Sequence, residues 1–270
     1  MKRMNLCWAA CLALVTVNLF AQAHTTQDRR RELDPTASHF NKGVEHGEAG
    51  RYEEAIKDFR HAVNLKPDFA RAYNGLCVAY AETNQPTQAI ESCKQAISLK
   101  PDFATAYYNL GRIYDDLNRD EDALEAFKRT VSLKPDYAAA YYELGRAYYD
   151  LSRFSEAVES QKQAIRLDPE FFKAHNDLGV LYFEMGQYAE AIRSLKQAVR
   201  LKPDLPVAYE ILGMTYLVLR RHGEAAEAFK QSVSRRVRVI LSRFFSAISP
   251  FCRFSVRLPL GNFDNRGETS

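Results

Sequence analysis

The sequence predicts an all-α protein, an α-solenoid of stacked antiparallel helix pairs. A short phrase, Leu-Lys-Pro-Asp or its variant Leu-Asp-Pro-Glu, returns every 34 residues, with its prolines at Pro67, Pro101, Pro135, Pro169 and Pro203. A fixed period of this size is typical of repeat architectures. Proline ends a helix because it has no N–H group to donate and its ring clashes with the preceding turn, so each phrase separates two units. Between the prolines, Tyr, Leu and Ala recur at helical spacing and predict helices with one apolar face.

The landmarks within one unit identify the kind of repeat. In the third unit they are Tyr107, Leu110, Gly111, Tyr114, Ala123, Phe127 and Pro135. Their spacing resembles the tetratricopeptide repeat, in which an aromatic residue, Leu-Gly and Tyr are followed by Ala, a large residue and a closing proline. The resemblance covers six units, roughly residues 36–234. It implies a right-handed superhelix whose concave face is lined by the first helix of each unit.

The amino-terminal segment, residues 1–23, is expected to be a signal peptide. Two basic residues are followed by a mostly apolar stretch over Leu6–Phe20 and by Ala21-Gln22-Ala23, the small-x-small pattern of a cleavage site. The apolar stretch is short for a membrane span and contains Asn18, which favours cleavage over a retained anchor. A lipid-acceptor role for Cys11 is disfavoured because this residue lies inside the apolar stretch. We therefore expect an exported chain, periplasmic or secreted.

A lead-in and six repeats account for residues 24–234. The lead-in, 24–35, is polar and flexible and ends in a helix start, with Asp34 as the cap and Pro35 in the first turn. The repeats are expected at 36–69, 70–103, 104–137, 138–171, 172–205 and 206–234, the last of them incomplete.

Glycine and asparagine mark the bends within the units. The two helices of a pair should turn at Gly50, Asn84, Asn118, Ser152, Gly186 and Arg220. Gly and Asn suit the left-handed conformation that ends a helix, whereas Ser152 and Arg220 fit it less well. Further glycines are expected where the helices of a pair cross, because a side chain there would hold the backbones apart. These are Gly111, Gly145, Gly179 and Gly213.

The first unit departs from the pattern at its front, where His39, Lys42 and His46 replace an aromatic residue, a leucine and a tyrosine. A terminal repeat has only one neighbour, so a more polar first helix is the expected cap of the array. A metal site formed by the two histidines is the alternative, but the sequence offers no third ligand.

Two cysteines distinguish the second unit. Cys77 stands where later units have glycine, and Cys93 replaces the large residue of the second helix. Both are expected to point into the core, where a free cysteine behaves as a small hydrophobic residue. A Cys77–Cys93 disulfide is the less favoured alternative. With Cys252 the mature chain has three cysteines, and an odd number does not predict a disulfide framework.

The repeat pattern stops after Ser234, and Val237 stands where the period predicts proline. Residues 235–270 hold seven arginines against two acidic residues, and apolar residues at helical spacing predict a short amphipathic helix over 237–248. We favour a closing helix over the last exposed core face. A basic membrane-surface helix over 235–248 is one alternative, and a tail created by a reading-frame change is another.

Composition and motifs argue against most chemical functions. The formal net charge is +3, with 37 basic and 34 acidic residues, whereas a nucleic-acid binder usually has a clear basic excess. The chain has no nucleotide-binding glycine loop, no H-E-x-x-H and no C-x-x-C. His175 is expected to be a packed residue rather than a base. We therefore expect no enzyme, no cofactor, no metal and no nucleic-acid partner.

The resemblance places groove residues at the fifth, ninth and twelfth positions of a unit. These are Asn74 and Val78 in the second unit, Tyr108, Arg112 and Asp115 in the third, Tyr142, Arg146 and Tyr149 in the fourth, and Asn176, Val180 and Phe183 in the fifth. Tyrosine and arginine often anchor interfaces because each combines a large contact area with hydrogen bonds.

The two groove arginines allow two interpretations. Arg112 and Arg146 occupy equivalent positions in adjacent units, so a carboxylate of a bound peptide could bridge them. With equal weight, Asp115, Asp116 and Asp150 already neutralise them as solvated ion pairs. The predicted function is a scaffold or adaptor that binds a protein or peptide segment in the groove, in the bacterial cell envelope. The alternative is an accessory or regulatory subunit of an envelope enzyme or secretion complex, with a membrane-docking tail.

Overall fold

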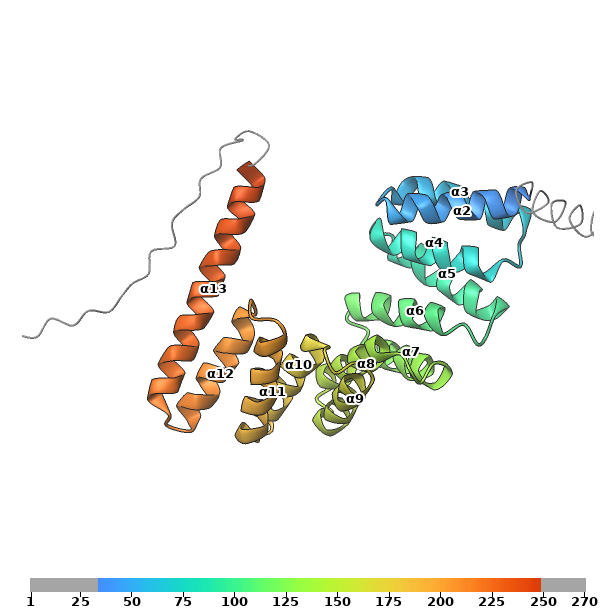
Figure 1. Ribbon diagram of the computed structural model, residues 1–270. Helices are drawn as coiled ribbons and strands as arrows, with labels where there is room; N and C mark the ends of the chain where they lie inside the picture. Colours follow the sequence, from blue (N-terminus) through green and yellow to red (C-terminus); the bar gives the residue numbers. More distant parts are fainter. Residues whose placement is uncertain (1–33, 249–270) are drawn as a thin grey trace, which may run out of the picture.

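The computed structural model describes residues 34–248, and twelve α-helices without a strand make up this part of the chain. They are α2 (Pro35–Glu48), α3 (Tyr52–Leu65), α4 (Ala70–Glu82), α5 (Pro86–Leu99), α6 (Ala104–Asp116), α7 (Asp120–Leu133), α8 (Ala138–Asp150), α9 (Phe154–Leu167), α10 (Phe172–Glu184), α11 (Tyr188–Leu201), α12 (Pro206–Val218) and α13 (His222–Ile248). Six helix pairs follow one another along an arc, from α2 and α3 at one end to α12 and α13 at the other (Figure 1). The predicted all-α solenoid is confirmed. The predicted signal peptide lies outside the described residues.

The proline phrases end helices as predicted. The second helices of the first five pairs, α3, α5, α7, α9 and α11, each stop at the leucine of the phrase, two residues before its proline. Lys66, which precedes Pro67, is already extended, with φ −136° and ψ 90°. At the start of the array, Asp34 caps α2 by accepting a hydrogen bond from the Thr36 N–H group at 2.9 Å.

All six predicted turn residues adopt the left-handed conformation. The φ angle is +72° at Gly50 and Gly186, and it lies between +54° and +58° at Asn84, Asn118, Ser152 and Arg220. The turn lets the next N–H group return to the end of the first helix, as Arg119 N does to Tyr114 O at 2.9 Å. The same bond closes the less suitable turns, from Arg153 N to Tyr148 O and from Arg221 N to Tyr216 O, both at 2.8 Å.

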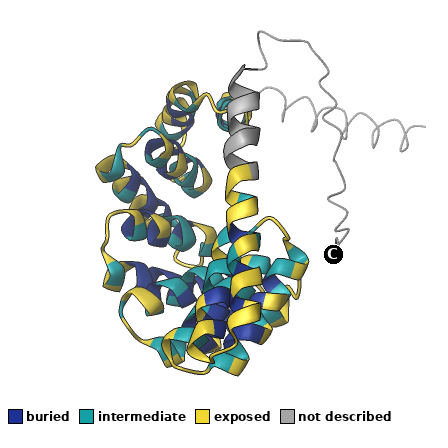
Figure 2. Cartoon of the chain, turned by 90° about the vertical axis from the view of Figure 1, so that its left-hand side faces the viewer, coloured by how far each residue is buried: buried dark blue, intermediate teal, exposed yellow. Residues whose placement is uncertain are grey.

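The helix pairs pack only against their neighbours. Each helix contacts the helix before and after it in the chain, and first helices of adjacent pairs also touch, as α4 does with α2 and α6. Figure 2 shows the buried residues where helices face one another and the exposed residues on the outer sides. The buried apolar residues form three clusters, one over α3 to α8, one between α9 and α10, and one over α11 to α13, and the first helices lie together along one face.

Small residues bring the two helices of a pair together. A Cβ atom on Gly111 of α6 would lie 2.7 Å from Cε1 of Phe127 in α7, whose side chain is 1% exposed. The other glycines at this position, Gly145, Gly179 and Gly213, meet Gln161, Leu195 and Phe229 in the same way. The predicted helix crossing at these glycines is confirmed.

The second unit holds a disulfide, which corrects the expectation of free core thiols. Cys77 of α4 and Cys93 of α5 are fully buried and joined, with Cα atoms 5.1 Å apart. Both residues lie in the core as predicted. They meet because Cys77 occupies the crossing position of the pair, where the facing side chain of the second helix is closest.

The polar residues at the front of the array contact the second helix of their own pair. His39 Nδ1 lies 2.9 Å from Oδ1 of Asp58, and His46 Nδ1 lies 3.1 Å from Oδ2 of the same carboxylate. His39 also stacks on His61, with ring centroids 4.9 Å apart. Within residues 34–248, no group of three or more His, Cys, Asp or Glu side chains is arranged to hold a metal ion. His39 therefore joins α2 to α3 through its hydrogen bond to Asp58 and its stacking on His61, and His46 lies beside the same carboxylate.

Helix α13 is one long helix, where a repeat helix and a separate closing helix were expected. Residues 237–248 are helical, but they continue α13 beyond the array instead of folding over its last pair (Figure 1). The reason is Val237, because no proline interrupts the helix at the place where five earlier phrases do. No helix in the described part of the chain is long and apolar enough to cross a membrane. The remainder of the tail, 249–270, lies outside the described residues.

Candidate functional site

The predicted groove residues lie on α4, α6, α8 and α10, the first helices of units two to five. Three of them are exposed, namely Val78, Arg112 and Tyr149. The partly buried ones are Asn74, Tyr108, Asp115, Tyr142, Arg146, Asn176, Val180 and Phe183. Two cavities take up five of these residues, one between α4 and α6 and one between α8, α9 and α10. The structure thus divides these five groove residues between two cavities, one between units two and three and one between units four and five.

The cavity between α8, α9 and α10, called the central cavity below, has a volume of about 260 Å³. It is lined by Gly145, Arg146, Tyr149, Asp150, Gln161, Asp177, Val180 and Leu181. Arg146, Tyr149 and Val180 are predicted groove residues, whereas Gln161 and Asp177 were not placed in the groove by the sequence. The sequence could have indicated Gln161, because this polar residue stands at the position where the preceding unit has the core residue Phe127.

Gln161 of α9 adds a buried amide to the wall of the central cavity. It packs against Gly145, the crossing glycine of its pair, and is 1% exposed. Its Nε2 donates to the carbonyl oxygen of Tyr142 at 3.3 Å, while Oε1 has no hydrogen-bond partner among the described residues. An unsatisfied buried acceptor costs about 1–3 kcal/mol and is uncommon in folded proteins. Gln161 Oε1 is therefore an unused acceptor at the site.

Carboxylates outnumber cations around the central cavity. Arg146 Nη1 lies 3.0 Å from Glu143 Oε2 and 3.5 Å from Asp115 Oδ2, so one guanidinium group serves two carboxylates. Asp177 forms no ion pair within residues 34–248. Burial is the main reason why the pKa values of Asp177, Glu143 and Asp150 are raised above those of ordinary carboxyl groups. The site is short of positive charge.

Two predicted groove tyrosines are held by aromatic neighbours. Tyr142 packs on Phe171 with ring centroids 5.0 Å apart, and Tyr108 packs on Tyr137 at 5.1 Å. Burial, followed by the charge of Asp177, raises the pKa of Tyr142, and burial raises the pKa of Tyr108 to about 12. Both hydroxyl groups therefore remain protonated and able to donate hydrogen bonds at neutral pH.

The second cavity lies between α4 and α6 and has a volume of about 290 Å³. It is lined by Val78, Ala81, Glu82, Asn109, Arg112, Ile113 and Asp116. Asn109 Nδ2 donates to Asn74 Oδ1 at 3.0 Å, which joins a predicted groove residue of α4 to the neighbouring helix α6. Arg112 makes no ion pair with the residues that the structure describes, whereas Arg146 does. The two arginines, equivalent in sequence, thus have different environments.

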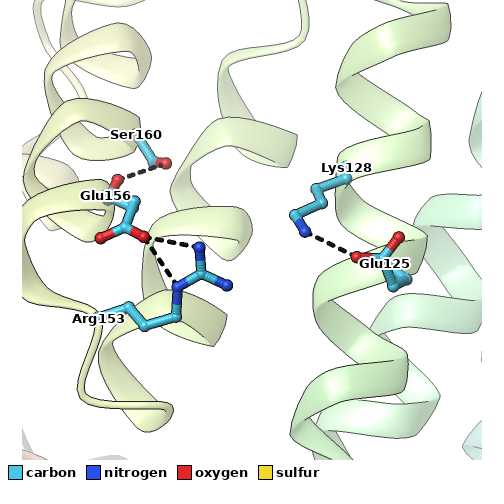
Figure 3. Close-up of polar contacts among 5 residues, drawn as sticks. All are labelled: Glu125, Lys128, Arg153, Glu156 and Ser160. Atoms are coloured by element: carbon cyan, nitrogen blue, oxygen red, sulfur yellow. Dashed lines mark hydrogen bonds and ion pairs between the residues drawn. The ribbon is translucent and has the colours of Figure 1, made fainter.

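Charges on the second helices are matched locally. Lys128 Nζ lies 2.7 Å from Glu125 in α7, and Arg153 Nη2 lies 2.6 Å from Glu156 at the start of α9 (Figure 3). The backbone carbonyl of Glu156 also accepts a hydrogen bond from Ser160 at 2.9 Å. Such exposed pairs, three residues apart, contribute little to stability. They do balance the charges at these positions, in contrast to the central cavity.

Asp177→Asn is expected to raise the free energy of unfolding at pH 7. Burial raises the pKa of Asp177 in the folded chain, so the protonated carboxyl group favours folding and its ionisation opposes folding. That favourable contribution is complete below the unfolded pKa of about 4 and is lost as the pH rises through the folded pKa. Asparagine keeps the shape and removes the charge. Urea unfolding followed by circular dichroism should show a clear gain at pH 7 and a smaller gain at pH 4.

The control for this prediction is the exposed Asp116→Asn, which should change the free energy of unfolding little at either pH. A chain with Asp177→Asn that is less stable than the parent at pH 7 would contradict the prediction.

Two family models match the chain. One, described as tetratricopeptide repeat, matches residues 108–170, 142–206 and 176–236. The other, described as TPR repeat, matches residues 46–84 and 79–117. Together they extend over 46–236 without a gap. No curated protein sequence matches significantly.

Several solved structures share the architecture. A crystal structure of MamA is 26% identical with a TM-score of 0.59, and the match covers 61% of this chain and 96% of that one. YrrB is 20% identical with a TM-score of 0.60, covering 70% of this chain and 97% of that one. PilF of Pseudomonas aeruginosa is 16% identical with a TM-score of 0.65, covering 81% of this chain and 94% of that one. The last two show a common fold alone.

Proposed function

The chain belongs to the tetratricopeptide repeat family, and we propose that it is an adaptor that holds a segment of a partner protein against its first helices. The observation that carries this proposal is the central cavity, which combines a buried unused acceptor with charged and aromatic groove residues. Stacked repeats of this kind offer extended concave surfaces and typically act as noncatalytic interaction scaffolds. YrrB, a structural neighbour, is described as a TPR protein with an unusual peptide-binding site.

The groove becomes more apolar toward the last unit, and this favours a partner segment with apolar residues at that end. Val180 and Phe183 on α10 are followed at the equivalent positions of α12 by Met214 and Leu217, which are 37% and 46% exposed. A bound segment that continues along α12 would cover these side chains and gain from their burial. We expect the partner segment to carry apolar residues at the end that reaches α12.

An exported location, in the bacterial cell envelope, is part of the proposal. It rests on the signal peptide predicted for residues 1–23. The Cys77–Cys93 disulfide supports it, because disulfides persist in oxidising compartments and are rare in the cytosol.

An accessory subunit that docks through its tail is the second candidate. Helix α13 favours it, because Val233, near the end of the last unit, and Val237, just beyond it, are 61% and 50% exposed. Arg236 lies nearby and pairs with Glu210 of α12 at 2.5 Å. A basic helix with exposed apolar residues is typical of membrane-surface contact.

Partner capture from a cell-envelope extract, followed by mass spectrometry, tests the proposal. Tyr142→Ala with Arg146→Ala should lose the partner, because truncation of an anchor residue typically weakens binding by about 2 kcal/mol or more. The matched control, Lys128→Ala with Arg153→Ala, removes two cations from the second helices and should retain the partner (Figure 3).

Two further outcomes separate the candidates. A chain ending at Ser234, which lacks Val237 and the arginines of the tail, should still capture the partner if the groove holds it, whereas loss of capture favours docking through the tail. Unchanged capture by the Tyr142→Ala, Arg146→Ala chain, with an unchanged circular dichroism spectrum, would remove the groove from consideration.

A further inference from the structure

Gln161 lines the central cavity and Asn176 precedes the lining residue Asp177, and each of these amides donates one hydrogen bond while its oxygen has no partner within residues 34–248. Gln161 Nε2 donates to the Tyr142 carbonyl oxygen at 3.3 Å, and Asn176 Nδ2 donates to Asp177 Oδ1 at 3.0 Å. A backbone carbonyl and an ionised carboxylate only accept hydrogen bonds, so turning either amide would place oxygen against oxygen, which favours the described orientations. Gln161 Oε1 and Asn176 Oδ1 are buried and have no hydrogen-bond partner in the described part of the chain. A ligand in the cavity that satisfies Gln161 Oε1 must bring an N–H or O–H donor.

The charges near the cavity determine whether a neutral or a positively charged donor is favoured. Asp150 and Asp177 line the cavity, while Arg146 is shared by Glu143 and Asp115. Lys173 is the other cation that acts on Asp177, and it is exposed, so water screens it. In a partly buried site an added positive charge is attracted strongly and an added carboxylate is repelled. The cavity therefore favours a donor that is also a cation.

The walls of the cavity suit a long side chain with a charged end. Val180 and Leu181 are apolar, and Tyr149 is 37% exposed, so its ring is accessible from the groove. Lysine and arginine bury their methylene stems against apolar surface and keep the charged group near polar partners. An aromatic ring in the cavity wall can add a cation–π contact.

We propose that the central cavity binds the side chain of a lysine or arginine in the partner segment, with Asp177 as the counter-charge and Gln161 Oε1 as an acceptor. This inference rests on the proposed function, because the cation belongs to the segment held in the groove. It replaces a bridging carboxylate at Arg112 and Arg146, since Arg146 is already paired with two carboxylates. An apolar side chain would leave Gln161 Oε1 unsatisfied and Asp177 without a counter-charge.

Fluorescence anisotropy with peptide pools tests the inference on the full chain. The probes are four labelled dodecapeptide pools of identical degenerate composition, with lysine, arginine, norleucine or glutamate fixed at the central position. The lysine or the arginine pool should bind at least tenfold more tightly than the norleucine pool, and the glutamate pool should bind most weakly. The comparison of lysine with arginine shows which cation fits better.

Three variants locate the effect. Asp177→Asn should remove the advantage of the cationic pools, and Gln161→Leu should reduce it, because each loses one partner of the bound cation. Glu125→Gln should preserve it, since Glu125 is exposed on the second helix α7 and lines neither cavity. The stability measurement described above establishes whether the Asp177→Asn chain is folded, and with a folded chain a lost preference reports on binding.

The outcomes distinguish the inference from the proposed function. Equal binding of the norleucine pool, tighter binding of the glutamate pool, or an unchanged preference with Asp177→Asn would overturn the cation site and leave the groove as a peptide-binding surface. Absence of binding by all four pools would count against both the cation site and the proposed function.

Discussion

Phe127→Ala is expected to lower the free energy of unfolding by about 3–5 kcal/mol, the usual effect of truncating a buried aromatic ring. The ring is 1% exposed, packs against Gly111 at the crossing of α6 and α7, and lies 6.0 Å from the ring of Tyr108. Gly111 has no side chain that could move into the vacated space, so the cavity persists after truncation. Urea unfolding followed by far-ultraviolet circular dichroism measures the loss.

Two substitutions serve as controls for Phe127→Ala. Phe127→Leu keeps most of the volume and should lose less than half as much stability. Leu65→Ala, at a side chain that is 52% exposed, should change the free energy of unfolding by less than about 0.5 kcal/mol. Hydrogen exchange should show that the destabilisation by Phe127→Ala is largest in α6 and α7 and declines away from them, because pairs contact only their neighbours. A loss below about 1 kcal/mol for Phe127→Ala would contradict the described packing.

Loss of the Cys77–Cys93 disulfide is expected to lower stability by roughly 3 kcal/mol, the value for a closed loop of about 15 residues. The two cysteines are 16 residues apart in the sequence, and the bond acts by restricting the unfolded chain. Unfolding with and without a reducing agent measures the effect. The Cys77→Ala, Cys93→Ala chain should be less stable than the parent and insensitive to the reducing agent.

Peptide mapping without reduction provides an independent test of the bond and of the location. In protein isolated from cells with free thiols blocked, the peptide containing Cys77 should be joined to the one containing Cys93. Both cysteines in the blocked, reduced form would contradict the disulfide in its cellular setting and would count against export.

Most of the fold could be predicted because the repeat fixes the register of every unit. Once the prolines set a period of 34 residues, the helix ends, the turns and the crossing glycines followed, and even the left-handed Ser152 and Arg220 fell at the predicted places. After Ser234, where the repeat pattern stops, the period no longer predicts where a helix ends. At Val237 the absence of proline was read as the end of the repeat helix, whereas physically it allows α13 to continue.

The site was predicted less completely. The repeat pattern identifies the groove residues of the first helices, but it does not show which residues of the second helices reach the groove. Arg146, Tyr149 and Val180 line the central cavity and stand at predicted ninth and twelfth positions, whereas the fifth-position residues Tyr142 and Asn176 are not part of its lining. Gln161 reaches the same cavity from the second helix, past Gly145, and this depends on how closely two helices approach. The disulfide depends on the same kind of information, since both cysteines could be placed in the core but their distance could not.

The packing of each helix pair on its neighbours alone has a mechanical consequence. The main contacts within residues 34–248 join adjacent pairs, so the described helices at the two ends of the arc are not held together by direct contacts. A small rotation at each of the five pair-to-pair junctions adds up along the array, and the molecule should flex like a spring while every pair stays folded. The disulfide stiffens the α4–α5 pair and leaves these junctions free. A long partner that contacts both ends of the array would therefore determine its curvature.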